Sequence, residues 1–271
     1  MPAAPGWQAA KGGCFVVADG VGGHRHGALA SRLAGETVLT SYFRSPMTNM
    51  VAALGASILA ANQRVSDFAA SDPSFRGMAS TVVAVAVRGA DAVVAHVGDS
   101  RAYLLRHRML YTLTRDHSWV QEMVDSGVIT PGDAAHHPYR HIVTRYAGMG
   151  RSAMPDVREL KLVPGDALLL CSDGISDRVP SREMGSVLNG PTVLNPACAL
   201  TYRAAALGSR DNASAIVIRY LPWSAPQMNA SRAGMQSERS ATDEALAALI
   251  FGGALMLGAG ISGVLLAGLL K

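Results

Sequence analysis

Residues 14–20 have the sequence CFVVADG, an apolar run that ends on Asp19 and a glycine. Short apolar runs bounded by Gly and Asp are typical of buried strands. The pattern recurs in 91–99 (DAVVAHVGD), which ends on Asp99, and in 166–174 (DALLLCSDG), which ends on Asp173 and a glycine. A fourth copy reverses the order, because Asp211 comes just before the apolar run 213–220 (ASAIVIRY).

These four aspartates predict a cation site. Three of them lie at the C-terminal ends of predicted strands and one lies at an N-terminal end, so an antiparallel sheet can bring them to one edge. Clustered carboxylates repel each other unless a hard cation neutralises them. Oxygen-only donors of this kind indicate Mg²⁺ or Mn²⁺, and the residues do not distinguish between the two ions.

The pattern along the chain predicts an α+β domain. Apolar residues at helical spacing predict helices at 27–43 and 48–71. Two hairpins are predicted, and they join the strands 80–87 and 92–97, and then 101–106 and 109–113. A short helix at 118–126, strands at 157–162 and 167–171, a helix at 196–207 and a strand at 214–219 complete the order. This order implies mostly antiparallel sheets covered by helices.

Composition excludes several classes of protein. The chain has 271 residues, of which 49% are hydrophobic, and a net charge of +4. Its Lys and Arg residues are scattered, so no nucleic-acid partner is expected. The three cysteines (Cys14, Cys171 and Cys198) are odd in number and form no Cys-x-x-Cys pair, which favours a reducing compartment and speaks against zinc.

The C-terminal part differs in composition. Residues 222–244 lack apolar periodicity and are predicted to be a flexible linker. Residues 245–270 form a run of 26 residues without a charge. As a helix this run would be about 39 Å long, enough to span a bilayer; a buried soluble helix is the alternative. Because 1–13 contains no signal peptide, we expect a single-pass protein of the cell inner membrane with residues 1–221 in the cytoplasm.

With these motifs in place, the chain resembles the bacterial form of the metal-dependent protein phosphatases, the type 2C family. The resemblance covers about residues 14–220 and rests on motifs that occur in the family's order. They are ADGVGGH at 18–24, AST at 79–81, VGDSR at 97–101, TRDHS at 114–118, GVITP at 127–131, HP at 137–138, SDG at 172–174 and RDN at 210–212.

The resemblance implies a fold, an activity and roles for individual residues. The fold is a four-layer α-β-β-α sandwich, and the activity is hydrolysis of phosphoserine and phosphothreonine in proteins, opposing a Ser/Thr kinase. Asp19 would bridge two Mn²⁺ or Mg²⁺ ions, and the Gly20 carbonyl would bind one of them. Asp173 and Asp211 would complete the binuclear site, and Asp99 would bind a third ion together with Asp173.

Other residues would support this site. The resemblance implies that Asn212 orients Asp211, and that Ser100 and Arg101 stabilise the turn at Asp99. No protein nucleophile is expected, because two divalent cations can activate a water for attack on phosphorus. The residues that bind the substrate are not identified by the motifs.

The chain departs from the family pattern before Asp19. Family members carry an N-terminal strand with a phosphate-binding Arg and an acidic motif, whereas residues 1–13 contain no Arg, Asp or Glu. Lys11 is the one basic side chain there that could meet a phosphate. The domain 1–221 is therefore expected to be N-terminally truncated. The alternative function is a catalytically weak or inactive membrane-tethered module that binds phosphoproteins.

Overall fold

Two four-stranded antiparallel sheets form the centre of the molecule. The computed structural model describes residues 11–21, 24–150, 153–190 and 195–221, together with 257–258 and 261–262. The first sheet has the order β1 (Gly13–Val17), β4 (Val82–Arg88), β5 (Asp91–Val97) and β8 (Asp156–Lys161). The second has the order β10 (Ala215–Arg219), β9 (Ala167–Cys171), β6 (Arg101–Arg106) and β7 (Met109–Thr112).

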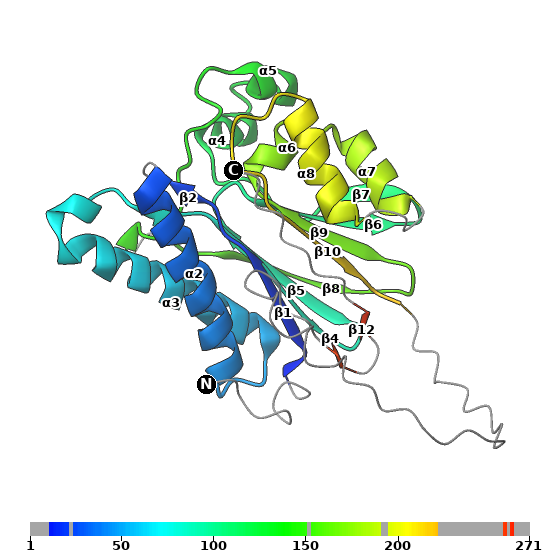
Figure 1. The fold of residues 1–271 in the computed structure, drawn as a ribbon, viewed down its shortest axis with the longest axis horizontal. Helices are drawn as coiled ribbons and strands as arrows, with labels where there is room; N and C mark the ends of the chain where they lie inside the picture. The colour runs from blue at the N-terminus through cyan, green and yellow to red at the C-terminus, as the bar shows by residue number, and fades with distance from the viewer. Residues whose placement is uncertain are drawn as a thin grey trace, which may run out of the picture.

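Helices cover the outer face of each sheet, as Figure 1 shows. The first sheet is covered by α2 (His24–Arg44) and α3 (Met50–Ser71), and the second by α7 (Ser181–Asn189) and α8 (Pro196–Ala206). This arrangement is the predicted four-layer sandwich. Every strand pairing among the described residues is antiparallel, which confirms that part of the prediction.

The alternation of side chains along each strand produces three apolar layers. On β4, Val82, Ala84 and Ala86 pack under the helices α2 and α3. The intervening residues Val83 and Val85 face the second sheet, where they pack in a layer with side chains of β6, β9 and β10. A third layer lies between the second sheet and α7 and α8. Buried on both faces, the central strands are continuously apolar rather than alternating, as their sequences indicated.

Two further helices lie beyond one end of the sheets. They are α4 (Trp119–Asp125) and α5 (Pro131–His136), with the one-turn helix α6 (Asp173–Ser176) close by (Figure 1). Ser118 caps α4 by accepting a hydrogen bond from the Gln121 N–H. Thr130 and Asp133 form a reciprocal capping box on α5. The remaining short elements are η1 (Pro73–Phe75), β2 (Gly20–Val21) and β3 (Ala79–Ser80).

Most predicted elements are present, and the differences have local causes. The second helix begins at Met50 rather than at 48, because the Asn49 side chain accepts the Ala52 N–H and caps the helix there. The helix α7 was not predicted. The hairpin between β6 and β7 turns at His107 and Arg108, which both have positive φ angles of 49° and 64°.

The C-terminal predictions fall largely beyond what the structure describes. The predicted linker 222–244 lies outside the described residues. So does the predicted membrane helix 245–270, apart from β11 (Leu257–Gly258) and β12 (Ile261–Ser262), which pair with each other as short strands and not as a helix. Among the described residues, the structure contains no helix with the length and apolar character needed to cross a membrane.

Candidate metal centre

The four predicted aspartates lie at one end of the two sheets. Asp19 follows β1, and Asp99 lies between β5 and β6. Asp173 is the first residue of α6, directly after β9, and Asp211 precedes β10. Each sheet therefore contributes to the same group of carboxylates, as the strand ends indicated.

The carboxylates of this group lie close enough to repel one another. Burial, followed by the negative charges of Asp173, Asp211 and Asp99, raises the pKa of Asp19 to about 8. The carboxyl groups of Asp19 and Asp173 are close enough to share a proton. Burial, followed by the charge of Asp173, raises the pKa of Asp99 to about 7. Such shifts are expected where carboxylates crowd together without a neutralising cation.

The donor atoms fit a divalent ion. The Oδ1 atom of Asp173 is buried and has no hydrogen-bond partner, although burial without a partner is costly for a carboxylate. A cation that binds Asp19 and Asp173 would satisfy this oxygen and remove the repulsion. The donors are all oxygen atoms, which suits Mn²⁺ or Mg²⁺.

The backbone around Asp19 is fixed by strand β3 and the residue after it. The Ser80 hydroxyl donates to the Asp19 carbonyl at 2.9 Å. Thr81 N–H donates to the same carbonyl at 2.8 Å, and the Asp19 N–H donates to the Thr81 hydroxyl at 3.2 Å. The Thr81 hydroxyl also lies 2.7 Å from that of Ser100. The AST motif therefore holds the Asp19 turn and connects it to the residue that follows Asp99.

Gly20 lies where two backbones touch. A β-carbon at Gly20 would lie 2.0 Å from the carbonyl oxygen of Gly27 in α2. The Gly20 carbonyl in turn faces Gly27, since a β-carbon on Gly27 would lie 2.7 Å from it. The glycine is therefore required by close packing of β2 on α2, while its predicted bond to a metal ion stays a prediction.

Asp211 and Asn212 lie beside the start of α6. The Asn212 N–H donates to Asp211 Oδ1 at 2.8 Å, so the contact that orients this carboxylate comes from the backbone of Asn212. The Ser172 hydroxyl donates to the Asn212 carbonyl at 3.4 Å. Gly174 packs on the same carbonyl, because its β-carbon would lie 2.2 Å from the oxygen.

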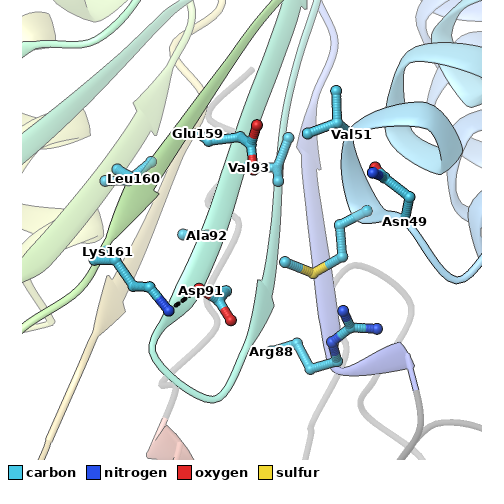
Figure 2. Close-up of a pocket in the computed structure, with 10 residues that line it drawn as sticks. Asn49, Val51, Arg88, Asp91, Ala92, Val93, Glu159, Leu160 and Lys161 are labelled. Carbon is cyan, nitrogen blue, oxygen red and sulfur yellow. Dashed lines mark ion pairs between the residues drawn. The ribbon is translucent and has the colours of Figure 1, made fainter.

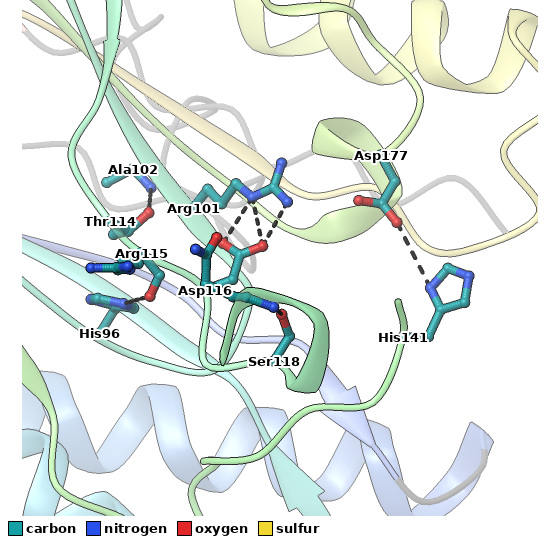
Figure 3. A network of polar contacts seen from close by, with 10 residues as sticks. His96, Arg101, Ala102, Thr114, Arg115, Asp116, Ser118, His141 and Asp177 are labelled. Carbon is teal, nitrogen blue, oxygen red and sulfur yellow. Dashed lines mark hydrogen bonds and ion pairs between the residues drawn. The ribbon is translucent and has the colours of Figure 1, made fainter. Parts of the chain in front are cut away.

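Arg101 forms an ion pair with Asp116 of the TRDHS motif. Its Nε and Nη2 atoms donate to the two carboxylate oxygens at 2.9 Å and 2.6 Å, a bidentate arrangement that Figure 3 shows. The pair is partly buried. It joins β6 to the segment that leads into α4, so Arg101 lies in a structural ion pair next to the Asp99 turn.

Two residues near the group were missed by the sequence analysis. Asp177 lies one helical turn beyond Asp173, and His141 follows the HP motif (Figure 3). Donor atoms of His141, Asp173 and Asp177 all lie within 4.8 Å of one another, with His141 Nδ1 at 3.8 Å from Asp177 Oδ2. The spacing of Asp177, four residues after Asp173, was a usable signal. His141 approaches from a loop that is distant in sequence, and no sequence pattern indicated its position.

A cavity adjoins this group. It has a volume of about 360 Å³. Its walls include Asp99, Arg101, Asp116, Arg140 and Asp177, and it lies beside α4 and α5. The cavity is thus lined by one predicted metal ligand, Asp99, and by the cationic side chains of Arg101 and Arg140.

A second cavity lies elsewhere. It has a volume of about 510 Å³ and is lined by residues of α3, β5 and β8, including Arg88 and the ion-paired Asp91 and Lys161 (Figure 2). Asp91 begins β5, whereas Asp99 follows its end, so this cavity is at the far end of the first sheet. Lys11 lies at that end as well, where its ammonium group donates to the Met47 carbonyl. The expectation that Lys11 could meet a phosphate beside Asp19 is therefore wrong in this structure.

Comparison with known proteins agrees with this geometry. The family model described as "Protein phosphatase 2C" matches residues 3–202. The "Serine/threonine phosphatase stp" of Listeria monocytogenes is 34% identical over 209 residues, covering 75% of this chain and 82% of that protein.

Solved structures show the same fold. The serine/threonine phosphatase PstP/Ppp of Mycobacterium tuberculosis matches with a TM-score of 0.70 and 35% identity, over 75% of this chain and 86% of that chain. The catalytic domain of PstP in complex with 2 manganese ions matches with a TM-score of 0.67 and 33% identity, over 75% of this chain and 85% of that chain.

The chain belongs to the protein phosphatase 2C family, a class of metal-dependent serine/threonine protein phosphatases. Enzymes of this family use Mn²⁺ or Mg²⁺, as the PstP structure with two manganese ions illustrates.

Proposed function

We propose that this chain hydrolyses phosphoserine and phosphothreonine in proteins, using two Mn²⁺ or Mg²⁺ ions bound by Asp19, Asp173 and Asp211. The observation that carries this proposal is the pair of carboxyl groups of Asp19 and Asp173. They lie close together, and the buried Oδ1 atom of Asp173 has no hydrogen-bond partner. When bound, two such ions lower the pKa of a water molecule and screen the charge of the phosphate.

The protein's own residues would hold the reacting groups in place. Thr81 and Ser80 fix the Asp19 backbone, and Asn212 orients Asp211 through its N–H. Asp99 faces the adjoining cavity and would bind a third ion together with Asp173. The Arg140 guanidinium on the wall of that cavity can meet a phosphate dianion.

The direct test is Mn²⁺-dependent hydrolysis of a phosphothreonine peptide and of p-nitrophenyl phosphate. Asp173→Asn should abolish turnover by the full chain. Asp67→Asn, on the exposed side of α3, is the matched control and should leave turnover unchanged. Absence of Mn²⁺-dependent turnover in the unmodified chain would reject the proposal. Tight Mn²⁺ binding in calorimetry without turnover would instead support a phosphoprotein-binding module.

We further propose that the enzyme acts at the cell inner membrane, with residues 1–221 on the cytoplasmic side, and that it opposes a Ser/Thr kinase. The support for an anchor is the run of 26 uncharged residues at 245–270 after a polar linker. The support for a kinase is chemical, since phosphoserine and phosphothreonine substrates are made by protein kinases. Membrane fractionation of the full chain and of a chain ending at 244 tests the anchor. If the full chain and the shortened chain were found in the membrane fraction to the same extent, the anchor would be rejected.

A further inference from the structure

Two histidines are buried beneath the turn that carries Asp99. The rings of His96 and His117 stack with their centroids 4.5 Å apart, and both residues are less than 5% exposed, at 4% and 3%. His96 is on β5, three residues before Asp99, and pairs across the sheet with Asp156 of β8. His117 comes from the TRDHS motif.

His117 makes two hydrogen bonds with the residue before Asp99. The backbone N–H of Gly98 donates to the His117 ring atom Nδ1 at 3.2 Å. The backbone N–H of His117 donates to the Gly98 carbonyl at 3.0 Å. Gly98 has a φ angle of +108°, and a β-carbon there would lie 2.6 Å from the Thr81 side chain. Gly98 is therefore held between Thr81 on one side and His117 on the other.

These contacts determine where the imidazole carries its proton. Because Nδ1 accepts the Gly98 N–H, the proton of the neutral ring is on Nε2. Nε2 lies 3.3 Å from Asp156 Oδ2 without a hydrogen bond to it, and the other oxygen of Asp156 accepts from Arg145 at 2.9 Å. The chain of contacts thus runs from Arg145 through Asp156 and His117 to Gly98.

The same geometry speaks against a metal ion here. Donor atoms of His96, His117 and Asp156 lie within 4.8 Å of one another, a spacing that would suit a transition metal. A metal on His117 Nε2 would have to displace the proton while Nδ1 still accepts the Gly98 N–H. That requires an imidazolate, so an ordinary neutral ring here positions other groups and binds no ion.

We propose that His117 is a positioning residue, which holds the Gly98–Asp99 turn so that the Asp99 carboxylate faces Asp173. This inference rests on the proposed metal-binding role of Asp99. The segment around His117 is itself tied to the loop before β8, because the Thr144 N–H donates to the His117 carbonyl at 2.8 Å. His117 therefore connects the Asp99 turn with the loop that carries Arg140 and His141.

The tautomer can be measured without any substitution. Nitrogen-15 NMR of the full chain should show the His117 ring with an unprotonated Nδ1 and a protonated Nε2 at neutral pH. His117→Asn identifies the signal by its disappearance. A protonated Nδ1 would overturn the inference, because that ring could not accept the Gly98 N–H.

Two matched polar variants separate positioning from mere packing. His117→Asn retains an acceptor near the Nδ1 position, whereas His117→Gln retains a polar group near Nε2 and loses the acceptor. In Mn²⁺ calorimetry we expect His117→Gln to lower the affinity for the ion that depends on Asp99 by about tenfold or more. The affinity of His117→Asn should stay within about threefold of that of the unmodified chain.

The Asp99→Asn variant identifies the ion concerned and separates the two possible failures. If Asp99→Asn binds Mn²⁺ like the unmodified chain, the proposed metal role of Asp99 fails and the inference fails with it. If Asp99→Asn is impaired but His117→Gln is not, or if His117→Asn is impaired as strongly as His117→Gln, the positioning role of His117 alone is overturned.

Discussion

Thr81 and Asp19 are joined by two hydrogen bonds that run in opposite directions, at 2.8 Å and 3.2 Å. One of them uses the Thr81 backbone N–H and persists whatever the side chain is. The other uses the Thr81 hydroxyl, which accepts the Asp19 N–H and also contacts Ser100. Thr81 is buried, at 2% exposure, so water cannot replace the hydroxyl.

Thr81→Val, which keeps the shape of the side chain, should therefore leave the Asp19 N–H without a partner. We expect a loss of about 1–3 kcal/mol in the free energy of unfolding, measured by urea denaturation. Mn²⁺ affinity should fall by about tenfold or more in calorimetry, because the Asp19 turn is less well fixed. Thr81→Ser retains the hydroxyl and should bind Mn²⁺ normally. Equal Mn²⁺ affinities of Thr81→Val and Thr81→Ser would show that the Thr81 hydroxyl does not affect the site.

Asp19→Asn should stabilise the metal-free protein at alkaline pH. The pKa of Asp19 is raised from 3.8 to about 8, so its contribution to stability is complete below pH 4 and is lost as the pH rises through 8. Asparagine has no charge to bury. The variant should be more stable than the unmodified protein at pH 8, by on the order of a few kcal/mol, with the difference disappearing toward pH 4.

Excess Mn²⁺ should reduce this difference in stability. Binding to the native state stabilises the unmodified protein by about 2.7 kcal/mol when the ion is at 100 times its Kd, whereas the variant should gain little. Thermal unfolding at pH 8 with and without Mn²⁺ measures both effects. Asp67→Asn serves as the control and should respond like the unmodified protein. A variant that is less stable than the unmodified protein without metal would contradict the argument from repulsion.

Gly98→Ala should be much more disruptive than the same change at Gly165. Both glycines have similar positive φ angles, +108° and +95°, but a β-carbon at Gly165 would meet nothing within 4 Å. Gly165→Ala should cost about 1 kcal/mol, from the backbone conformation alone. Gly98→Ala adds a collision with Thr81 and should cost about 3 kcal/mol or more. Similar losses of stability in urea denaturation would mean that the packing at Gly98 can relax.

Asp116→Asn should weaken the fold through its bidentate pair with Arg101. The two side chains are 14% and 29% exposed, so removing one charge leaves the other poorly solvated. We expect a cost on the order of 3 kcal/mol, and a double-mutant cycle with Arg101→Gln should show strong coupling. The control is Asp91→Asn, whose exposed pair with Lys161 should be worth less than about 1 kcal/mol. Equal losses of unfolding free energy in Asp116→Asn and Asp91→Asn would contradict the argument that burial strengthens the first ion pair.

Much of the fold was predictable because buried strands have a local signature. The runs that became β1, β5, β9 and β10 are mostly apolar, and each has an aspartate at or near one end. Their aspartates could be predicted to meet, because strand ends in antiparallel sheets gather at an edge. Which strand belongs to which sheet was not visible, since the pairing of β1 with β4 joins residues about 70 positions apart along the chain.

The surroundings of the aspartates were less predictable. His141 approaches Asp177 only because the loop after α5 folds back over α6, and no local pattern records such a contact. The roles of Thr81 and of His117 depend on hydrogen bonds between segments that are distant in sequence. The C-terminal membrane segment stays a prediction from hydropathy.

The distribution of the aspartates over both sheets has a mechanical consequence. Asp19 extends from the first sheet, whereas Asp173 and Asp211 extend from the second. The layer between the sheets consists of apolar side chains, whose packing is not directional. An ion shared by Asp19 and Asp173 would cross-link the two sheets at one end. We expect a chelator to accelerate amide hydrogen exchange first in the edge strands β1 and β10, before the helices on the outer faces respond.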